Sequence, residues 1–246
     1  FEFRMLGSSN SIACANIMLN SAVAESLRIY ADRLEKADNF EESLHRMIQN
    51  TIKDHKKIIF NGNGYDDAWI KEAVEERGLL NYRTTPDCMP HLLDKKNEEM
   101  LIRHRVFSEA ELKSRCEIML DNYNKTVVIE ATTMVSMAKK EIVPSIEAYE
   151  KELADTAAVK KAVNPDISCG YETTLLKKLS TLGDRIYEKA EGLEQALLEI
   201  EKGYMIRDEV LTKMSELRLV CDEAETLTAK SYWPYPTYGD ILFSVR

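Results

Sequence analysis

The feature that most constrains the fold is one long apolar pattern that runs from Leu112 to Ala157. Its apolar side chains recur every three or four residues, with a mean spacing above the ~3.5 residues of a left-handed coiled coil. This spacing favours a long, nearly straight helix in a bundle over a dimeric zipper. Pro144 lies inside the pattern and is expected to bend the helix, because proline cannot donate to the carbonyl of Lys140. The pattern consists of Leu112, Cys116, Met119, Tyr123, Val127, Ala131, Met134, Ala138, Ile142, Ile146, Tyr149, Leu153 and Ala157.

Weaker patterns of the same period predict further helices on both sides of this segment. Asn39 stands where a helix start is expected, and Ser108 forms a capping box with Glu111 just before the long pattern. The short breaks between the later helices imply antiparallel neighbours in a bundle. The first predicted helix covers residues 12–34, the second starts at residues 39–42, and the third runs from Asp66 or Asp67 to Gly78. After the long segment, one helix begins near Tyr171, following the break at residues 164–166, and another follows Gly203.

Two segments depart from the helical period. Residues 79–97 contain Pro86 and Pro90, which cannot continue a helix, and we predict an ordered connector and a domain edge there. Residues 232–240 are rich in aromatic residues and proline, and residues 241–245 are typical of a strand. Because this tail solvates poorly, we expect it to dock against the first part of the chain or against polypeptide outside it.

Composition excludes several classes of function. The 246 residues, of which 44% are hydrophobic and 30% charged, are enough for one large or two modest domains. A formal net charge of −9 argues against nucleic acid or an anionic membrane as a partner, and no apolar run reaches membrane-spanning length. The cysteines and histidines lack metal-ligand spacing, so we expect reduced thiols in a cytoplasmic protein and histidines that are surface or cap residues. They are Cys14, Cys88, Cys116, Cys169, Cys221, His45, His55, His91 and His104.

The first four residues suggest a site. The chain does not start with Met, and we expect it to open inside a longer protein. A short strand over residues 1–4 would place Glu2 and Arg4 on one face and Phe1 and Phe3 on the other. An acidic oxygen ligand beside a guanidinium suits a metal-bound phosphate or carboxylate. From these residues alone, a salt bridge on an edge strand is the favoured interpretation of the pair.

Several of these segments resemble parts of one family. Residues 1–4 resemble the R-I-E-x-R segment near the end of the glutamine synthetase catalytic domain, and the helices predicted after them resemble the helices that close that domain. The end of the chain resembles the C-terminal strand of the same enzymes, whereas ordinary bacterial and eukaryotic forms lack the long helical segment. Taken together, the chain resembles the type III glutamine synthetases, chiefly over residues 1–9, 61–65, 83–90 and 233–240.

The resemblance implies a ligase that makes glutamine from glutamate, ammonia and ATP. Such enzymes phosphorylate the γ-carboxylate of glutamate, and ammonia then displaces the phosphate. Glu2 matches a ligand of the Mg²⁺ or Mn²⁺ ion that orients glutamate and phosphate. Arg4 matches a catalytic arginine that contacts the transferring phosphoryl group or the substrate carboxylate. Residues 5–11 depart from the family's usual Phe-Pro-Asp-Pro loop, so nothing in this loop is assigned, and the nucleotide-binding residues are unknown.

The resemblance and the patterns together predict a mainly α fold, namely a long-helix bundle with a small remnant of the α+β glutamine synthetase catalytic domain. Residues 1–78 would form the end of the catalytic domain, residues 79–230 a helical C-terminal extension, and residues 231–246 a return segment that packs on the catalytic domain. We expect the chain alone to be inactive, and its parent to be a homo-oligomer of stacked hexameric rings. The alternative is a non-enzymatic helical oligomerisation or interaction module.

Overall fold

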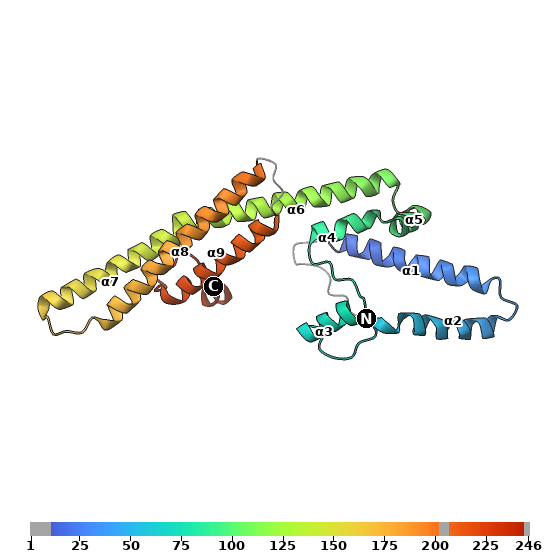
Figure 1. Cartoon of the computed structure of the whole chain (residues 1–246), viewed down its shortest axis with the longest axis horizontal. Helices are drawn as coiled ribbons and strands as arrows, with labels where there is room; N and C mark the ends of the chain where they lie inside the picture. Colours follow the sequence, from blue (N-terminus) through green and yellow to red (C-terminus); the bar gives the residue numbers. More distant parts are fainter. Residues whose placement is uncertain (1–10, 202–206, 244–246) are drawn as a thin grey trace. The chain divides into compact units, whose positions relative to one another are not determined.

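The structure, a computed structural model, describes residues 11–201 and 207–243, which form helices joined by loops (Figure 1). No strand occurs within these residues, and the predicted mainly α, long-helix fold is confirmed. The chain divides into two compact units, unit 1 (Phe1–Asp121) and unit 2 (Asn122–Arg246). The predicted domains 1–78, 79–230 and 231–246 remain a prediction. In the described parts of the chain, no helix is both long and apolar enough to cross a membrane.

Unit 1 begins with two helices that lie side by side, α1 (Ile12–Leu34) and α2 (Phe40–His55) (Figure 1). Each helix starts at a polar side chain that accepts a hydrogen bond from a backbone amide of the first turn. Ser11 accepts from the amide of Ala13, and Asn39 accepts from the amide of Glu42. The sequence therefore predicted the starts of both helices correctly. At the other end of α2, a short 3₁₀ turn (Lys56–Ile58) follows the helix.

The predicted helix from Asp66 to Gly78 is also present, with a change of hydrogen-bond pattern in its middle. It consists of α3 (Asp67–Lys71), capped by the Asp66 side chain, and a π-helical turn, η2 (Glu72–Glu76). Gly78 follows with a φ of +60°, a conformation that favours glycine because it has no Cβ.

The segment predicted as an ordered connector contains short helical elements. They are α4 (Thr85–Cys88), the 3₁₀ turn η3 (Met89–Leu93) and α5 (Lys95–Arg103). Pro86 and Pro90 both lie in the first turn of their helices, where the missing amide hydrogen costs nothing. The prolines therefore start helices here, although they prevent a single long one.

The buried cluster of unit 1 is small. It contains Leu101, Phe107 and Leu112, with Ile17 and Met18 of α1 packed against it. The turn between α5 and the next helix includes Arg105, a non-glycine residue whose φ is +56°. The helix α5 that precedes this turn is in contact with α1.

The long predicted helix is confirmed as three consecutive helical segments. The first, α6 (Glu109–Met137), starts at the predicted capping box, in which the Ser108 amide donates to Glu111 and the Glu111 amide donates to the Ser108 hydroxyl. A π-helical turn, η4 (Ala138–Ile142), and α7 (Val143–Val163) follow without a break.

The change from α to π geometry falls just before Pro144, where the sequence predicted a perturbation. The amide of Val143 donates to the carbonyl of Ala138, five residues earlier, instead of to the carbonyl four residues earlier. Pro144 then lies in the first turn of α7, where it needs no donor. The extra residue of the π turn accommodates the proline inside one continuous helical segment.

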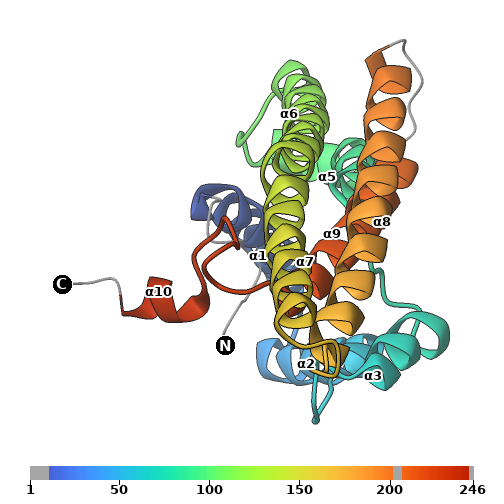
Figure 2. The same ribbon diagram turned by 90° about the vertical axis from the view of Figure 1, so that its left-hand side faces the viewer.

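Unit 2 is a bundle in which α8 (Gly170–Glu201) packs against α7 on one side and α9 (Arg207–Leu227) on the other (Figures 1 and 2). These helices and their short connection at residues 164–169 confirm the predicted antiparallel neighbours. The predicted apolar stripes form the core, whose fully buried members include Ala131, Ile146, Leu179, Ile186, Ala190, Leu193, Val210 and Ala224.

The tail after α9 returns along α7 (Figure 2). The ring of Tyr232 lies 5.2 Å from that of Tyr149, its hydroxyl donates to Glu152, and Trp233 and Tyr235 pack against the bundle core. The strand predicted over residues 241–245 is wrong where the structure describes it. A short helix, α10 (Tyr238–Leu242), covers this region, because Thr237 and Asp240 form a capping box that starts a helix. Residues 244 and 245 lie outside the described residues.

Candidate functional site

The two predicted site residues, Glu2 and Arg4, lie outside the described residues. The predicted strand over residues 1–4 and the unassigned loop up to residue 10 also lie outside them. The metal role of Glu2 and the catalytic role of Arg4 therefore remain predictions. The first described element after them is α1.

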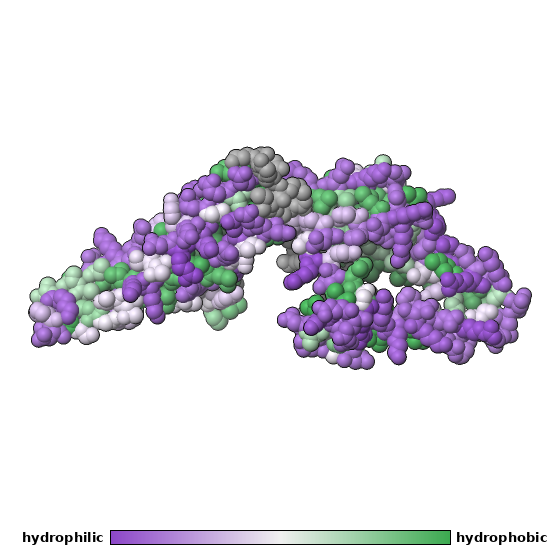
Figure 3. All heavy atoms as spheres, viewed as in Figure 1, coloured by the Kyte–Doolittle hydropathy of each residue, from purple (hydrophilic) through white to green (hydrophobic). Residues whose placement is uncertain are grey.

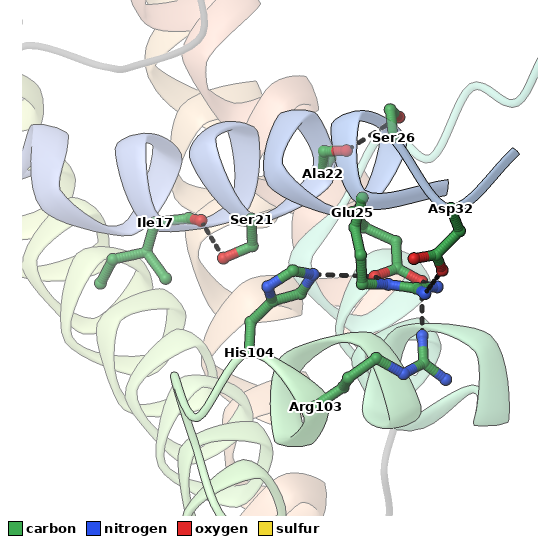
Figure 4. A network of polar contacts seen from close by, with 9 residues as sticks. Ile17, Ser21, Ala22, Glu25, Ser26, Asp32, Arg103 and His104 are labelled. Atoms are coloured by element: carbon green, nitrogen blue, oxygen red, sulfur yellow. Dashed lines mark hydrogen bonds and ion pairs between the residues drawn. The ribbon is translucent and has the colours of Figure 1, made fainter. Parts of the chain in front are cut away.

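One carboxylate holds α1 against the end of α5. Glu25 of α1 accepts two hydrogen bonds from the guanidinium of Arg28, at 3.0 and 2.9 Å, and one from Nε2 of His104 at 2.8 Å (Figure 4). Arg103 also donates to it, and Arg28 donates in turn to Asp32 at 2.6 Å. Arg103 and His104 end α5, so the carboxylate joins two helices that are far apart in the sequence.

The charges around Glu25 fix its ionisation. Hydrogen bonds from Arg28, and to a smaller extent from His104, together with the charge of Arg103, outweigh the effect of burial and lower the pKa of Glu25 to about 2. Glu25 in turn raises the pKa of Arg28. Because both carboxylate oxygens are occupied and the group stays ionised, Glu25 is an acceptor in a structural ion pair and has no free lone pair directed at a substrate.

A second cluster of charges lies at the π turn of unit 2. Lys139 donates to Glu194 at 2.5 Å and to Glu191, and its ammonium group lies 5.6 Å from the centre of the Tyr187 ring. The hydrogen bond to Glu191, followed by that to Glu194, raises the pKa of Lys139. A lysine held in its charged form cannot act as a general base, so this cluster fastens η4 to α8.

Metal-binding residues do not come together in the parts of the chain that the structure describes. Among residues 11–201 and 207–243, no three His, Cys, Asp or Glu side chains are grouped so that they could hold a metal ion. His104 caps α5 and pairs with Glu25, and His91 pairs with Asp94 at 2.9 Å and stacks on Tyr82. Both histidines have structural partners, which agrees with the expected cap or surface role.

A groove lies beside α7. It has a volume of about 570 Å³ and is lined by Lys151, Glu152, Asp155 and Tyr232, among others. Its charges are of both signs, and Glu152 already accepts a hydrogen bond from the Tyr232 hydroxyl. This arrangement holds the tail on α7 and contains no nucleophile paired with a base.

Sequence reasoning missed the Glu25 cluster. Part of it was visible, because Glu25, Arg28 and Asp32 have the spacing of side chains on one face of a helix. The decisive partners, Arg103 and His104, are 78 and 79 positions away from Glu25, and nothing local in the sequence connects them.

Comparisons with known proteins agree on one family. Residues 43–161 match the family model described as "Glutamine synthetase C-terminal domain". The chain is 38% identical to a glutamine synthetase of Butyrivibrio fibrisolvens over 85% of its length. It is 28% identical, over 99% of its length, to a type-3 glutamine synthetase of Dictyostelium discoideum and to a glutamine synthetase of Bacteroides fragilis. It spans only 31% to 35% of the length of these relatives.

Proposed function

The chain belongs to the glutamine synthetase family, and from this premise we propose that it is the C-terminal portion of an ATP-dependent glutamate–ammonia ligase. The observation that supports the proposal most strongly is the similarity to a type-3 enzyme over 99% of the chain. The parent protein would phosphorylate the γ-carboxylate of glutamate with ATP and release the phosphate when ammonia attacks.

Two residues of this chain would take part in that reaction. Glu2 would supply one oxygen ligand to a Mg²⁺ or Mn²⁺ ion, since carboxylate oxygens suit these hard cations. Arg4 would contact the transferring phosphoryl group or the substrate carboxylate with its planar pair of donors. When bound, the metal ion neutralises charge on the phosphate. Phosphoryl transfer depends mainly on such positioning and charge neutralisation.

The chain by itself would be inactive. A metal ligand and one arginine do not make an ATP site, and the described residues bring no further metal group together. The remaining metal ligands and the nucleotide pocket would come from the rest of the parent protein. The parent would be a cytoplasmic homo-oligomer of stacked hexameric rings. The long helices of unit 2 would then be an extension outside the catalytic domain.

An assay of the chain and of its intact parent tests the proposal. Glutamate-dependent and ammonia-dependent phosphate release from ATP, in the presence of Mg²⁺ or Mn²⁺, should be present in the parent and absent in the chain alone. Turnover by the chain alone would contradict the claim of an incomplete site. A parent protein without glutamine formation would contradict the ligase itself and would favour the helical interaction module.

A further inference from the structure

The helices α8 and α9 are joined by ion pairs that cross their interface. Lys189 of α8 donates to Glu216 of α9 at 2.8 Å, and one turn earlier on α8 the guanidinium of Arg185 donates to Glu223 at 3.5 Å. Because the two helices are antiparallel, each step towards the start of α8 faces a residue nearer the end of α9. A base of α8 therefore meets an acid of α9 at two successive levels of the interface.

Closer to the start of α8 this pairing stops. Lys177 and Lys178 lie beside Thr226 and Leu227 of α9, neither of which is charged. On α8 itself, every residue three or four positions from either lysine is Ser, Thr or Leu. Among residues 11–201 and 207–243, no carboxylate forms an ion pair with Lys177 or Lys178. The two ammonium groups thus add positive charge that the described structure does not balance.

These lysines line a groove between the two helices, which has a volume of about 430 Å³. Its floor is apolar, since Leu182 is only 3% exposed and Leu227 is half-buried. Three cationic side chains and one carboxylate surround this floor. We call it the α8–α9 groove, and its charged members are Lys177, Lys178, Arg185 and Glu223.

The α8–α9 groove carries excess positive charge although the whole sequence has a formal net charge of −9. The groove beside α7, in contrast, is lined by two lysines and two carboxylates. Figure 3 shows hydrophilic side chains on the surface of unit 2 with smaller apolar areas between them. Cations that lie close together without a counter-charge repel one another, and a bound anion would relieve this repulsion.

We propose that the α8–α9 groove binds a small anion that carries at least two phosphate or carboxylate groups. Its volume lies in the usual range of small-molecule sites, whereas a stable contact with another protein needs about 800 Å² from each partner. Lys177 and Lys178 would each donate to one anionic group, because an ammonium donates readily to phosphate and carboxylate oxygens. The inference goes beyond the proposed function, since no residue of the groove takes part in the ligase reaction.

Amide chemical shifts of the isotope-labelled chain, titrated separately with pyrophosphate and with citrate, test the proposal. At least one of the two anions should shift the amides of residues 177–185 and 223–227 in a saturable way, with half-saturation below about 1 mM. Amides of residues 143–153 in α7 serve as the internal reference and should change little. The probe that binds more tightly tells whether phosphate or carboxylate groups are preferred, and no saturable shift with either probe would overturn the proposal.

Matched variants separate the groove from the overall charge of the chain. Lys177→Gln with Lys178→Gln should weaken binding at least about tenfold, because each change removes a charged donor. Lys140→Gln with Lys151→Gln removes the same charge from exposed positions outside the groove and should change the affinity less than about twofold. Equal weakening by both pairs would mean that the anion responds to net charge alone, and would overturn the proposal.

A third variant should act in the opposite direction. Glu223→Gln removes the carboxylate of the groove and frees the guanidinium of Arg185, so the affinity for the anion should rise by roughly twofold to fivefold. A lower affinity would contradict the proposed site. An acidic peptide that shifts these amides when neither small anion does so would identify a protein segment as the occupant and would also overturn the proposal. None of these measurements depends on glutamine formation, so they test the groove separately from the ligase.

Discussion

The carboxylate of Glu25 and the imidazole of His104 lie 2.8 Å apart, although 79 positions separate them in the sequence. With Arg103, His104 ties the middle of α1 to the end of α5, and Arg28 holds the carboxylate in place from within α1. The small buried core of unit 1, which includes Leu101 of α5, also packs against α1 through Ile17 and Met18. Ion pairs and apolar contacts therefore both hold α1 against α5.

Replacing Glu25 with glutamine should lower the thermal unfolding temperature of unit 1. The change removes the negative charge that Arg28 and Arg103 share and weakens the acceptor of the His104 ring, and it leaves the two guanidinium groups to repel one another. Thermal unfolding followed by circular dichroism measures the effect. Asp32→Asn, which removes an exposed partner of Arg28 only, should lower the temperature much less.

The contribution of Glu25 should depend on pH in one direction. Its pKa falls from the usual 4.5 to about 2 on folding, so the folded state binds fewer protons in this range. The stabilisation is fully present above about pH 4.5 and disappears as the pH falls towards 2. The difference in unfolding temperature between wild type and Glu25→Gln should therefore shrink over this interval, and a difference that grows on acidification would contradict the assignment.

Leu179→Ala should be among the most damaging substitutions in unit 2. Leu179 is fully buried, and removing its side chain leaves a cavity that costs about 2–5 kcal/mol. The matched control is Leu219→Ala on α9, where the side chain is 67% exposed and the expected cost is below about 0.5 kcal/mol. Urea unfolding of the two variants measures both values, and equal costs would show that the bundle packs differently.

Arg105→Gly and Arg105→Ala should differ in stability although both remove the same charge. Because Arg105 has a φ of +56°, glycine fits its backbone without strain and alanine does not. The glycine variant should be more stable than the alanine variant by about 1 kcal/mol. Denaturant unfolding of the pair measures this difference, and a more stable alanine variant would rule out the left-handed turn after α5.

In the parent enzyme, Glu2→Ala should weaken metal dependence and Arg4→Ala should lower turnover. Loss of one charge-stabilising group commonly lowers such rates roughly a hundredfold or more. Steady-state kinetics with Mg²⁺ and Mn²⁺ titrations measure both effects. Wild-type kinetics in the two variants would refute the site, and the edge-strand salt bridge would then be the better interpretation of this pair.

Local patterns in the sequence predicted those features that depend on neighbouring residues. The starts of α2 at Asn39 and of α6 at Ser108 follow from side chains that reach their own first turn. The stripes of α8 and α9 follow from a period that repeats over many turns, where chance matches are rare. These features need no knowledge of distant parts of the chain.

Sequence reasoning failed where two local signals competed or where partners were distant. Residues 241–245 have strand-like side chains, but Thr237 and Asp240 cap a helix first, and this signal was present in the sequence. In the π turn before Pro144, the Val143 amide donates its hydrogen bond to the carbonyl of Ala138, and the spacing of apolar residues does not reveal this change. The partners of Glu25 could not be found from spacing at all, because α5 meets α1 only in the folded chain.

In unit 2, α8 packs against the helix that precedes it and the helix that follows it. Its contacts therefore join neighbours along the chain, and topologies of this kind close quickly because little loop entropy is lost before the contacts form. The core of the bundle consists of residues of unit 2 alone, so it can close without partners elsewhere in the chain and shield its apolar stripes from aggregation.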